Sequence, residues 1–139
     1  MKTYFFFLLP LLILASCKKF EEDGTTFQAE KKLTKSWVYS EKILSDGTVY
    51  TPVFTYIQTF NEDGTMLLTS DYDTAFTVSN WKWEFVDGKT KIRSTLGNWD
   101  TYIFSDIVKL TDTEFWIKTQ LIDNGEVFGL PDLEKHIAL

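Results

Sequence analysis

The chain has 139 residues, which suits one small domain preceded by a targeting segment. Aromatic residues make up 17% of it and recur along the mature part of the chain, which argues against disorder. The formal net charge of -6 makes the phosphate backbone of a nucleic acid an unfavourable partner. The single cysteine, Cys17, excludes an internal disulfide. The single histidine, His136, is expected to be a tail residue and not a metal ligand.

Residues 1–16 have the composition of a bacterial export signal. Lys2 gives a positive start, and the run from Tyr4 to Ala15 is almost wholly apolar. A membrane-spanning helix needs about 20 residues, so this shorter run fits a secretory signal. Leu14-Ala15-Ser16-Cys17 resembles the lipobox of bacterial lipoproteins, in which the signal is removed before an acylated cysteine. The resemblance implies a membrane anchor through acyl chains on Cys17; an ordinary secretory signal with an incidental cysteine is the alternative.

Residues 17–32 are polar and charged and have no hydrophobic period, so the lipidated cysteine is expected to be followed by a flexible tether. The acid run Glu21-Glu22-Asp23 is similar to surface-export signals on lipoproteins of Bacteroidota, although a solvated linker explains it equally well. With the lipobox, it implies a lipid-anchored protein of the outer membrane that faces the periplasm or the cell surface. One or two helical turns are expected within residues 27–35.

From residue 37 onward, short β-branched and aromatic runs are separated by turn signals. Sequential hairpins predict an all-β fold, an eight-stranded antiparallel up-and-down barrel over residues 33–123, with a β-sandwich as the competing fold. Residues 124–139 are expected to form a C-terminal tail. The expected strands cover residues 37–44, 48–51, 55–60, 66–70, 76–86, 89–95, 99–110 and 114–122. The aspartates expected to cap backbone amides in the turns are Asp46, Asp63, Asp87 and Asp112.

Four short motifs, in their order along the chain, resemble the lipocalin-like domain lipoproteins of Bacteroidota. The resemblance implies a lipocalin-like barrel in the cell envelope, in which Trp37 closes the floor. Lys35 stands where lipocalins have a glycine, and the later lipocalin motifs have no match, so the resemblance implies a fold and a location more than a ligand. The motifs are Leu33-Thr34-Lys35-Ser36-Trp37, the strand and turn from Gln58 to Thr65, Asn80-Trp81-Lys82-Trp83 before Asp87-Gly88, and the hairpin from Ile107 to Ile117.

The tryptophans are the strongest indication of function in the mature domain. Trp81, Trp83 and Phe85 alternate along one expected strand, so they share one face, which is most simply the barrel interior. Aromatic faces stack and bury a large area, which predicts a small apolar or aromatic-stacking ligand. A place in the core is the simpler interpretation for any one of them, and Trp99 is expected at an exposed loop tip. The candidate ligand-contacting residues are Trp37, Tyr39, Trp81, Trp83, Trp99 and Trp116.

The sequence offers no catalytic constellation. Turn capping explains the carboxylates, and one histidine near the C-terminus leaves no Ser-His-acid arrangement. The glycines stand singly in turns and form no phosphate-binding loop. We therefore expect a non-enzymatic, monomeric, lipid-anchored binding domain without cofactor or metal. The alternative is an envelope protein-interaction module with a filled core, which would contact a protein partner through loops 71–77 and 95–100.

Overall fold

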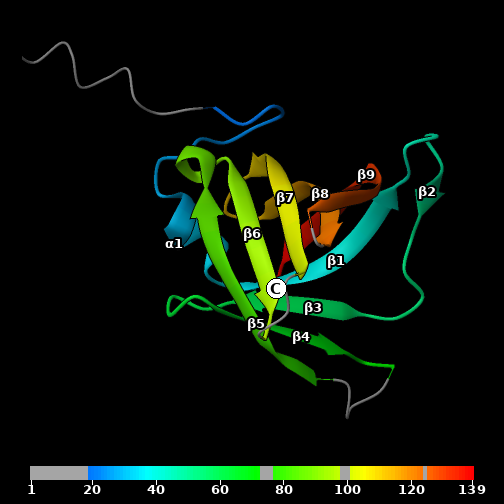
Figure 1. Ribbon diagram of the computed structural model, residues 1–139, viewed down its shortest axis with the longest axis horizontal. Coiled ribbons are helices and arrows are strands. Elements are labelled where there is room, and N and C mark those ends of the chain that lie inside the picture. Colours follow the sequence, from blue (N-terminus) through cyan, green and yellow to red (C-terminus); the bar gives the residue numbers. More distant parts are fainter. Residues whose placement is uncertain (1–18, 73–76, 98–100, 124) are drawn as a thin grey trace, which may run out of the picture.

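The computed structural model describes residues 19–72, 77–97, 101–123 and 125–139. It is a closed eight-stranded antiparallel β-barrel with one short helix (Figure 1), which confirms the predicted all-β, lipocalin-like barrel. The elements are α1 (Ala29–Leu33), β1 (Ser36–Ile43), β2 (Val49–Tyr50), β3 (Tyr56–Phe60), β4 (Thr65–Ser70), β5 (Thr77–Val86), the 3-10 turn η2 (Asp87–Lys89), β6 (Lys91–Leu96), β7 (Thr101–Leu110), β8 (Glu114–Asp123) and β9 (Glu126–Ala138).

The barrel closes because β1 pairs with both β3 and β9. The order around the wall is β1, β3, β4, β5, β6, β7, β8 and β9, each antiparallel to its neighbour. The closing ladder runs from Trp37 opposite Ala138 to Ile43 opposite Leu133. A sandwich would leave free sheet edges, whereas this ladder joins the first and last wall strands, so the competing fold is excluded. The hairpins β3–β4, β5–β6 and β7–β8 form as predicted.

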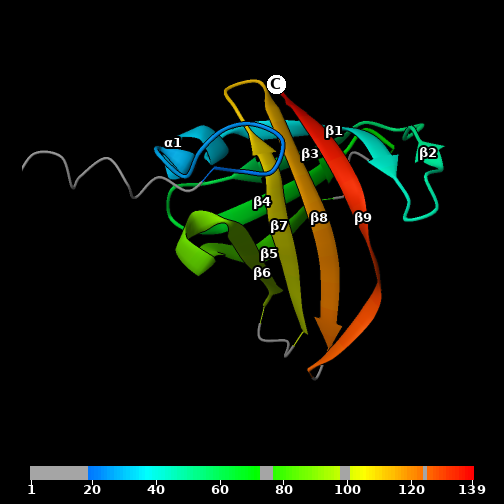
Figure 2. The same ribbon diagram turned by 90° about the horizontal axis from the view of Figure 1, so that it is seen from above.

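The predicted strand at residues 48–51 is not part of the barrel wall. Only Val49–Tyr50 is extended there, as β2, which pairs with the end of β1 through Ile43 and Lys42. Pro52 stands two residues after Tyr50 and has no N–H to continue a ladder. Both side chains of β2 are exposed, so burial does not hold this segment in the wall. Figure 2 shows β2 and α1 at opposite ends of the barrel.

The predicted tail of residues 124–139 is wrong, because Glu126–Ala138 forms β9, the eighth wall strand. It pairs with β8 on one side and with β1 on the other. Charged residues stand on both faces of this strand, so its sequence lacks the apolar alternation that marks a half-buried strand. His136 is accordingly a core residue, 4% exposed, and not a tail residue.

Residues 19–28, predicted as part of a flexible tether, pack against the barrel instead. Phe20 is 5% exposed within the core. The Glu22 amide donates to the Val108 carbonyl at 2.9 Å, and the Leu110 amide donates to the Asp23 carbonyl at 3.1 Å. Gly24 has a φ of +92°, and a Cβ there would collide with the Leu110 carbonyl. This segment and α1 together cover one end of the barrel, so apolar burial orders it despite its polar sequence.

The covered end holds the apolar core. Trp37 is fully buried there, and its indole N–H donates to the Leu33 carbonyl of α1 at 2.9 Å. Trp37 thus takes the floor position expected for it. At the opposite end, which we call the mouth, β1, β4, β6 and β8 end and β3, β5, β7 and β9 begin. The core consists of Phe20, Ala29, Leu33, Trp37, Phe60, Met66, Trp83, Ile92, Ile107, Leu110, Phe115 and Ile117.

The turns are held in two different ways. The carboxylates of Asp46 and Asp63 accept from the amides of Thr48 and Thr65, as predicted. The Thr48 amide lowers the pKa of Asp46, and the Thr65 hydroxyl and amide lower the pKa of Asp63. The expectation for the other two turn acids is wrong. The Asp87 carboxylate lies 3.3 Å from Lys91 Nζ. In the β7–β8 turn, the hydroxyl of Thr111 is the group that accepts from the amides of residues 113 and 114.

Candidate functional site

Toward the mouth, one wall of the barrel interior becomes polar. Paired residues on antiparallel strands share a face of the sheet. His136 is buried beside Phe115, so Glu134 and Asp132, which precede it by two and four residues on β9, also face inward. Glu134 is paired with Lys42 on β1, and Asp132 with Thr119 on β8. We call this surface the polar arc; it consists of Tyr39, Lys42, Ser105, Thr119, Asp132, Glu134 and His136.

The opposite wall is mainly apolar, although Gln58 and Ser94 also face inward there, paired with Leu68 and Ile103. Trp81 of β5 is paired with Met66 of the core and with Leu96, which places it on the inner face. We call this surface the apolar wall; it consists of Leu68, Val78, Trp81, Leu96 and Ile103. At the rim of the mouth, Leu121 and Phe128 are paired on the same face and are 40% and 50% exposed. Solvent therefore reaches inward-facing side chains on the mouth side, unlike those of the floor.

The charges of the polar arc do not cancel. Lys42 Nζ lies 3.0 Å from Asp132 Oδ2 and 3.9 Å from Glu134 Oε1, so one ammonium group faces two carboxylates. The second Asp132 oxygen accepts from the Ser45 amide at 3.2 Å. The three charged side chains are a quarter to a third exposed, which leaves their fields less screened than on an open surface. The arc therefore carries one surplus negative charge, centred on Glu134.

His136 is the deepest polar residue of the arc. Its ring lies between those of Tyr39 and Phe115, tilted to both, with centroids 5.3 and 5.4 Å away. Its Nε2 lies 3.9 Å from Glu134 Oε2, which is beyond hydrogen-bond distance. Among the described residues, the buried side-chain nitrogen and oxygen atoms without a hydrogen-bond partner are the two nitrogens of this ring. Leaving such groups unpaired is costly, so this ring lacks hydrogen-bond partners that a further polar group could supply.

The pKa of Tyr39 depends on its burial and on the negative charges of the arc. Burial raises the pKa of Tyr39 well above its usual value, and the negative charge of Glu134 raises it further, with smaller effects from Tyr50 and Asp132. Burial is thus the larger cause of the shift, and the carboxylates add to it.

This pKa predicts a loss of stability at alkaline pH. Unfolded Tyr39 releases its proton near pH 10, whereas folded Tyr39 keeps it to higher pH. The folded state then binds more protons than the unfolded state, so the free energy of unfolding falls as the pH rises above about 10. We expect a shallower fall for Tyr39→Phe, measured by urea unfolding between pH 8.5 and 11.5. Tyr72→Phe, at a 70% exposed side chain, should keep the original slope; equal slopes for all three proteins would contradict the assignment.

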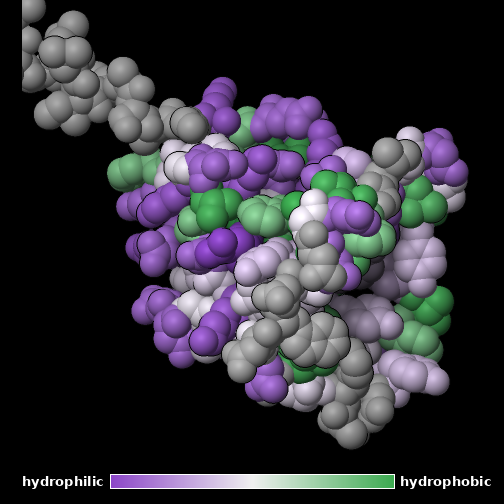
Figure 3. Space-filling view, in the orientation of Figure 1, coloured by the Kyte–Doolittle hydropathy of each residue, from purple (hydrophilic) through white to green (hydrophobic). Residues whose placement is uncertain are grey.

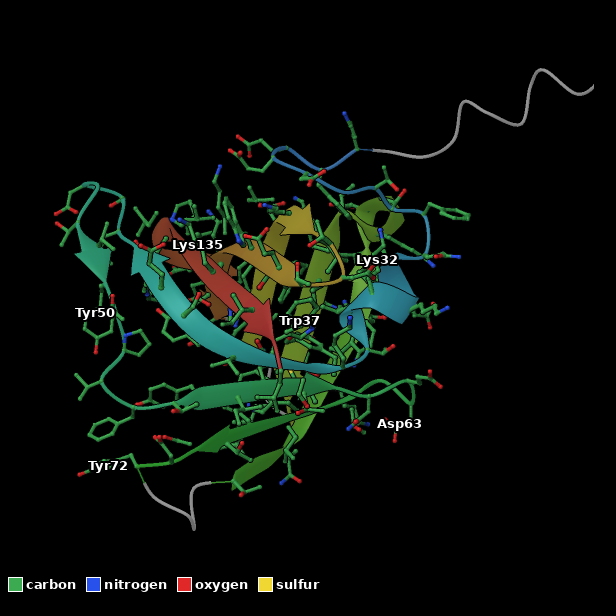
Figure 4. All side chains as sticks on the ribbon, turned by 180° about the vertical axis from the view of Figure 1, so that it is seen from behind. Lys32, Trp37, Tyr50, Asp63, Tyr72 and Lys135 are labelled. Carbon is green, nitrogen blue, oxygen red and sulfur yellow. The ribbon has the colours of Figure 1, made fainter. Side chains whose placement is uncertain are left out.

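The predicted aromatic residues take three different places. Tyr39 and Trp81 line the mouth-side interior, whereas Trp37 and Trp83 belong to the floor, where the Trp83 indole N–H donates to the Asn61 carbonyl at 3.1 Å. Trp116 does not face the interior. It lies on the outer face between the ammonium groups of Lys109 and Lys135, 4.5 and 4.7 Å from the ring centroid. In Figure 4, Trp37 lies on β1 and Lys135 on β9. Cys17 and Trp99 lie outside the described residues.

Sequence reasoning missed the charged members of the arc, Lys42, Asp132, Glu134 and His136. One signal was present: the last three stand at every second position, so any strand there carries a polar stripe on one face. Nothing in the sequence shows that this face is the inner one. Pairing with Phe115 and Ile117 decides it.

Two shallow hollows lie outside the barrel, at the covered end. Their volumes are about 370 and 260 Å³, and Gly64, Trp83 and Glu84 line both. Charged side chains that form ion pairs surround them, Arg93 with Glu84 and Lys89 with Glu30. Mutually satisfied charges of this kind are typical of a solvated surface. The polar arc, with its surplus charge and its unpaired imidazole, is the stronger candidate site.

The chain matches no protein-family model and no curated protein, so the site is interpreted from its own geometry. Within the described residues, no three His, Cys, Asp or Glu side chains are grouped in a way that could hold a metal ion. No helix in that part of the chain has the length and apolar composition needed to cross a membrane.

Proposed function

We propose that the protein is a lipid-anchored lipoprotein of the bacterial outer membrane, whose lipocalin-like barrel binds a small amphiphilic ligand on the mouth side of its interior. The observation that carries the proposal is the polar arc facing the apolar wall. A barrel that only needed a stable core would carry apolar side chains on both inner walls. Here polar and charged groups face inward on β1, β7, β8 and β9.

The two walls suggest how such a ligand would be held. Small-molecule sites are mostly apolar, with a few polar groups that orient the ligand. The apolar wall offers Trp81, Leu96 and Ile103 for an apolar body, and the polar arc offers hydrogen-bond partners for a polar head. This arrangement favours an amphiphile over the purely apolar or aromatic-stacking ligand that the sequence predicts.

Native mass spectrometry of the protein isolated from its own cells tests binding directly. We expect a stoichiometric adduct of small-molecule mass that is lost on mild denaturation. If the natural protein is isolated without any adduct, and small amphiphiles added to it do not bind, ligand binding is refuted. Loss of the adduct on Trp81→Ala, with retention on Trp116→Ala, would place it inside the barrel, because only the first side chain faces inward.

The lipid anchor rests on the resemblance of Leu14-Ala15-Ser16-Cys17 to a lipobox, and two or more acyl chains on one residue suffice for stable attachment. We expect the natural protein to incorporate labelled palmitate in growing cells, and Cys17→Ala to incorporate none. Ser16→Ala keeps a small residue before the cysteine and should be labelled like the natural protein. Palmitate incorporation that survives Cys17→Ala, or no incorporation by the natural protein, would refute the anchor.

A protein-interaction module is the second candidate, because hydrophobic side chains are exposed beside the mouth. Val53 is 82% and Tyr72 is 70% exposed, and the Tyr72 ring stacks on Phe54 with centroids 4.3 Å apart. Figure 3 shows hydrophobic side chains at the right edge of the molecule, on the side of β2. Exposed apolar patches are typical of interaction sites. Co-purification of an envelope protein that is lost on Phe54→Ser would favour this candidate; loops 71–77 and 95–100 extend beyond the described residues.

We propose a non-enzymatic role for either candidate. Asp132 is engaged with Lys42, and the hydroxyls of Ser105 and Thr119 bond to each other at 3.2 Å. A serine or threonine nucleophile requires a base within hydrogen-bond reach. In the described interior, neither hydroxyl has such a base.

A further inference from the structure

The unpaired imidazole and the surplus carboxylate lie side by side in the polar arc. His136 is 4% exposed, and its Nε2 lies 3.9 Å from Glu134 Oε2. A neutral imidazole has one donor and one acceptor nitrogen, and a carboxylate accepts hydrogen bonds only. A group that donates to both the imidazole acceptor and the carboxylate would therefore satisfy the two at once.

A protonated amine has the chemistry that these neighbours require. An ammonium group carries three donors and no acceptor, and its positive charge matches the surplus negative charge of the arc. The ring of Tyr39, beside that of His136, adds an aromatic face that attracts a cation. A ligand carboxylate or phosphate would instead meet two carboxylates held by a single lysine, Lys42.

The apolar wall determines which kind of group can be attached to the amine. Leu68, Trp81 and Leu96 face inward across the barrel from the arc, so a body attached to the amine would leave water on that side. The ligand class that fits both walls is a compact amine with an apolar ring or short chain.

We propose that the barrel binds a cationic amine of this kind, with its ammonium group donating to Glu134 and to the acceptor nitrogen of His136. The inference rests on the proposed ligand-binding function and names the chemical class of the ligand. Tyr39, Asp132 and Lys42 are positioning residues, since they hold the field and the orientation of these two groups.

The experiment uses the only imidazole of the chain as its probe. The full natural protein, labelled with ¹⁵N-histidine, is titrated at pH 7.5 with cyclohexylamine, cyclohexanecarboxylate and cyclohexanol, which share one ring and differ in charge. We expect the amine to cause a saturable shift of the His136 ring-nitrogen signals. The alcohol should bind about tenfold or more weakly, because it lacks the charge-assisted hydrogen bond. The carboxylate should cause no saturable shift.

Two glutamate variants distinguish the effect of an inner carboxylate on amine binding from that of an outer one. Glu134→Gln removes the inner charge at constant size, and we expect it to weaken amine binding about tenfold or more. Glu41→Gln is the matched control, because Glu41 lies on the outer face, 2.8 Å from Lys135 Nζ, with similar exposure. It should bind the amine like the natural protein.

The outcomes distinguish the inference from the function on which it rests. Saturable binding of the carboxylate or the alcohol at least as strong as that of the amine would leave a ligand-binding barrel and overturn the amine. Equal weakening by both glutamate variants would overturn the assignment to Glu134. No saturable shift with any of the three probes would overturn both. The comparison of probes on the natural protein needs no variant, so it decides the ligand class even if Glu134→Gln fails to fold.

Discussion

A chain that ends after Asp123 is expected not to fold. It lacks β9, which pairs with β8 and β1 along the height of the barrel. Its loss would leave two long unpaired edges and expose Phe115 and Trp37 from the core. A domain of this size has a free energy of unfolding of about 5–15 kcal/mol. The free energy lost with one wall strand is expected to exceed that total. Circular dichroism and urea unfolding would show no cooperative transition, and the truncated chain should aggregate.

Removal of Leu139 alone is the control. Its side chain is 78% exposed, and its loss removes one backbone hydrogen bond, from its amide to the Ser36 carbonyl, so the free energy of unfolding should fall by no more than about 1.5 kcal/mol. A chain that ends after Asp123 but still unfolds cooperatively, with most of its stability intact, would show that residues 126–138 do not close the barrel in solution.

Trp37→Ala is expected to cost about 3–5 kcal/mol, the range for loss of a large aromatic side chain from a packed core. Trp37 is fully buried, its ring lies 5.4 Å from that of Phe115, and its N–H donates to the Leu33 carbonyl. The substitution would leave a cavity under α1 and remove one of the two hydrogen bonds to the Leu33 carbonyl, which would keep the bond from the Lys35 amide at 2.8 Å. Urea unfolding followed by circular dichroism measures the loss, and Trp37→Phe should retain part of the stability because it fills most of the space.

Trp116→Ala is the matched control for the floor tryptophan. It lies on the outer face, where its contacts with Lys109 and Lys135 are each worth about 0.5–1 kcal/mol at exposed sites. Its loss should therefore destabilise the protein much less than Trp37→Ala. Equal losses for the two tryptophans would contradict the assignment of one to the floor and the other to the outer wall.

The strands from β3 to β8 were predictable because each has a local signal. Asp-Gly turns and alternating aromatic residues mark the β3–β4 and β5–β6 hairpins, and both form. The segment 48–51 carried similar signals but stayed outside the wall. The floor end of β1 pairs with β3, and only the mouth end of β1, which extends past β3, pairs with β2. Local propensity identifies a strand but not its partners.

The candidate site was predictable only in part. Trp81 and Tyr39 face the mouth-side interior as expected of ligand-contacting residues, and Trp116 does not, because its position on β8 alternates with the buried Phe115 and Ile117. Glu134 and His136 were hidden because their strand carries charges on both faces, and a single sequence does not reveal which face is inner.

The sequence by itself determined the class of the fold, since turn signals and alternating residues in the chain are local and need no distant partner to be recognised. The tertiary structure alone decided which strand closes the barrel, that residues 19–28 cover its floor, and that Asp132, Glu134 and His136 face inward. Each of these depends on pairing or packing between segments far apart in the chain, such as Trp37 with Ala138 or Asp23 with Leu110. Such contacts follow from the burial of the whole apolar core, which no local pattern encodes.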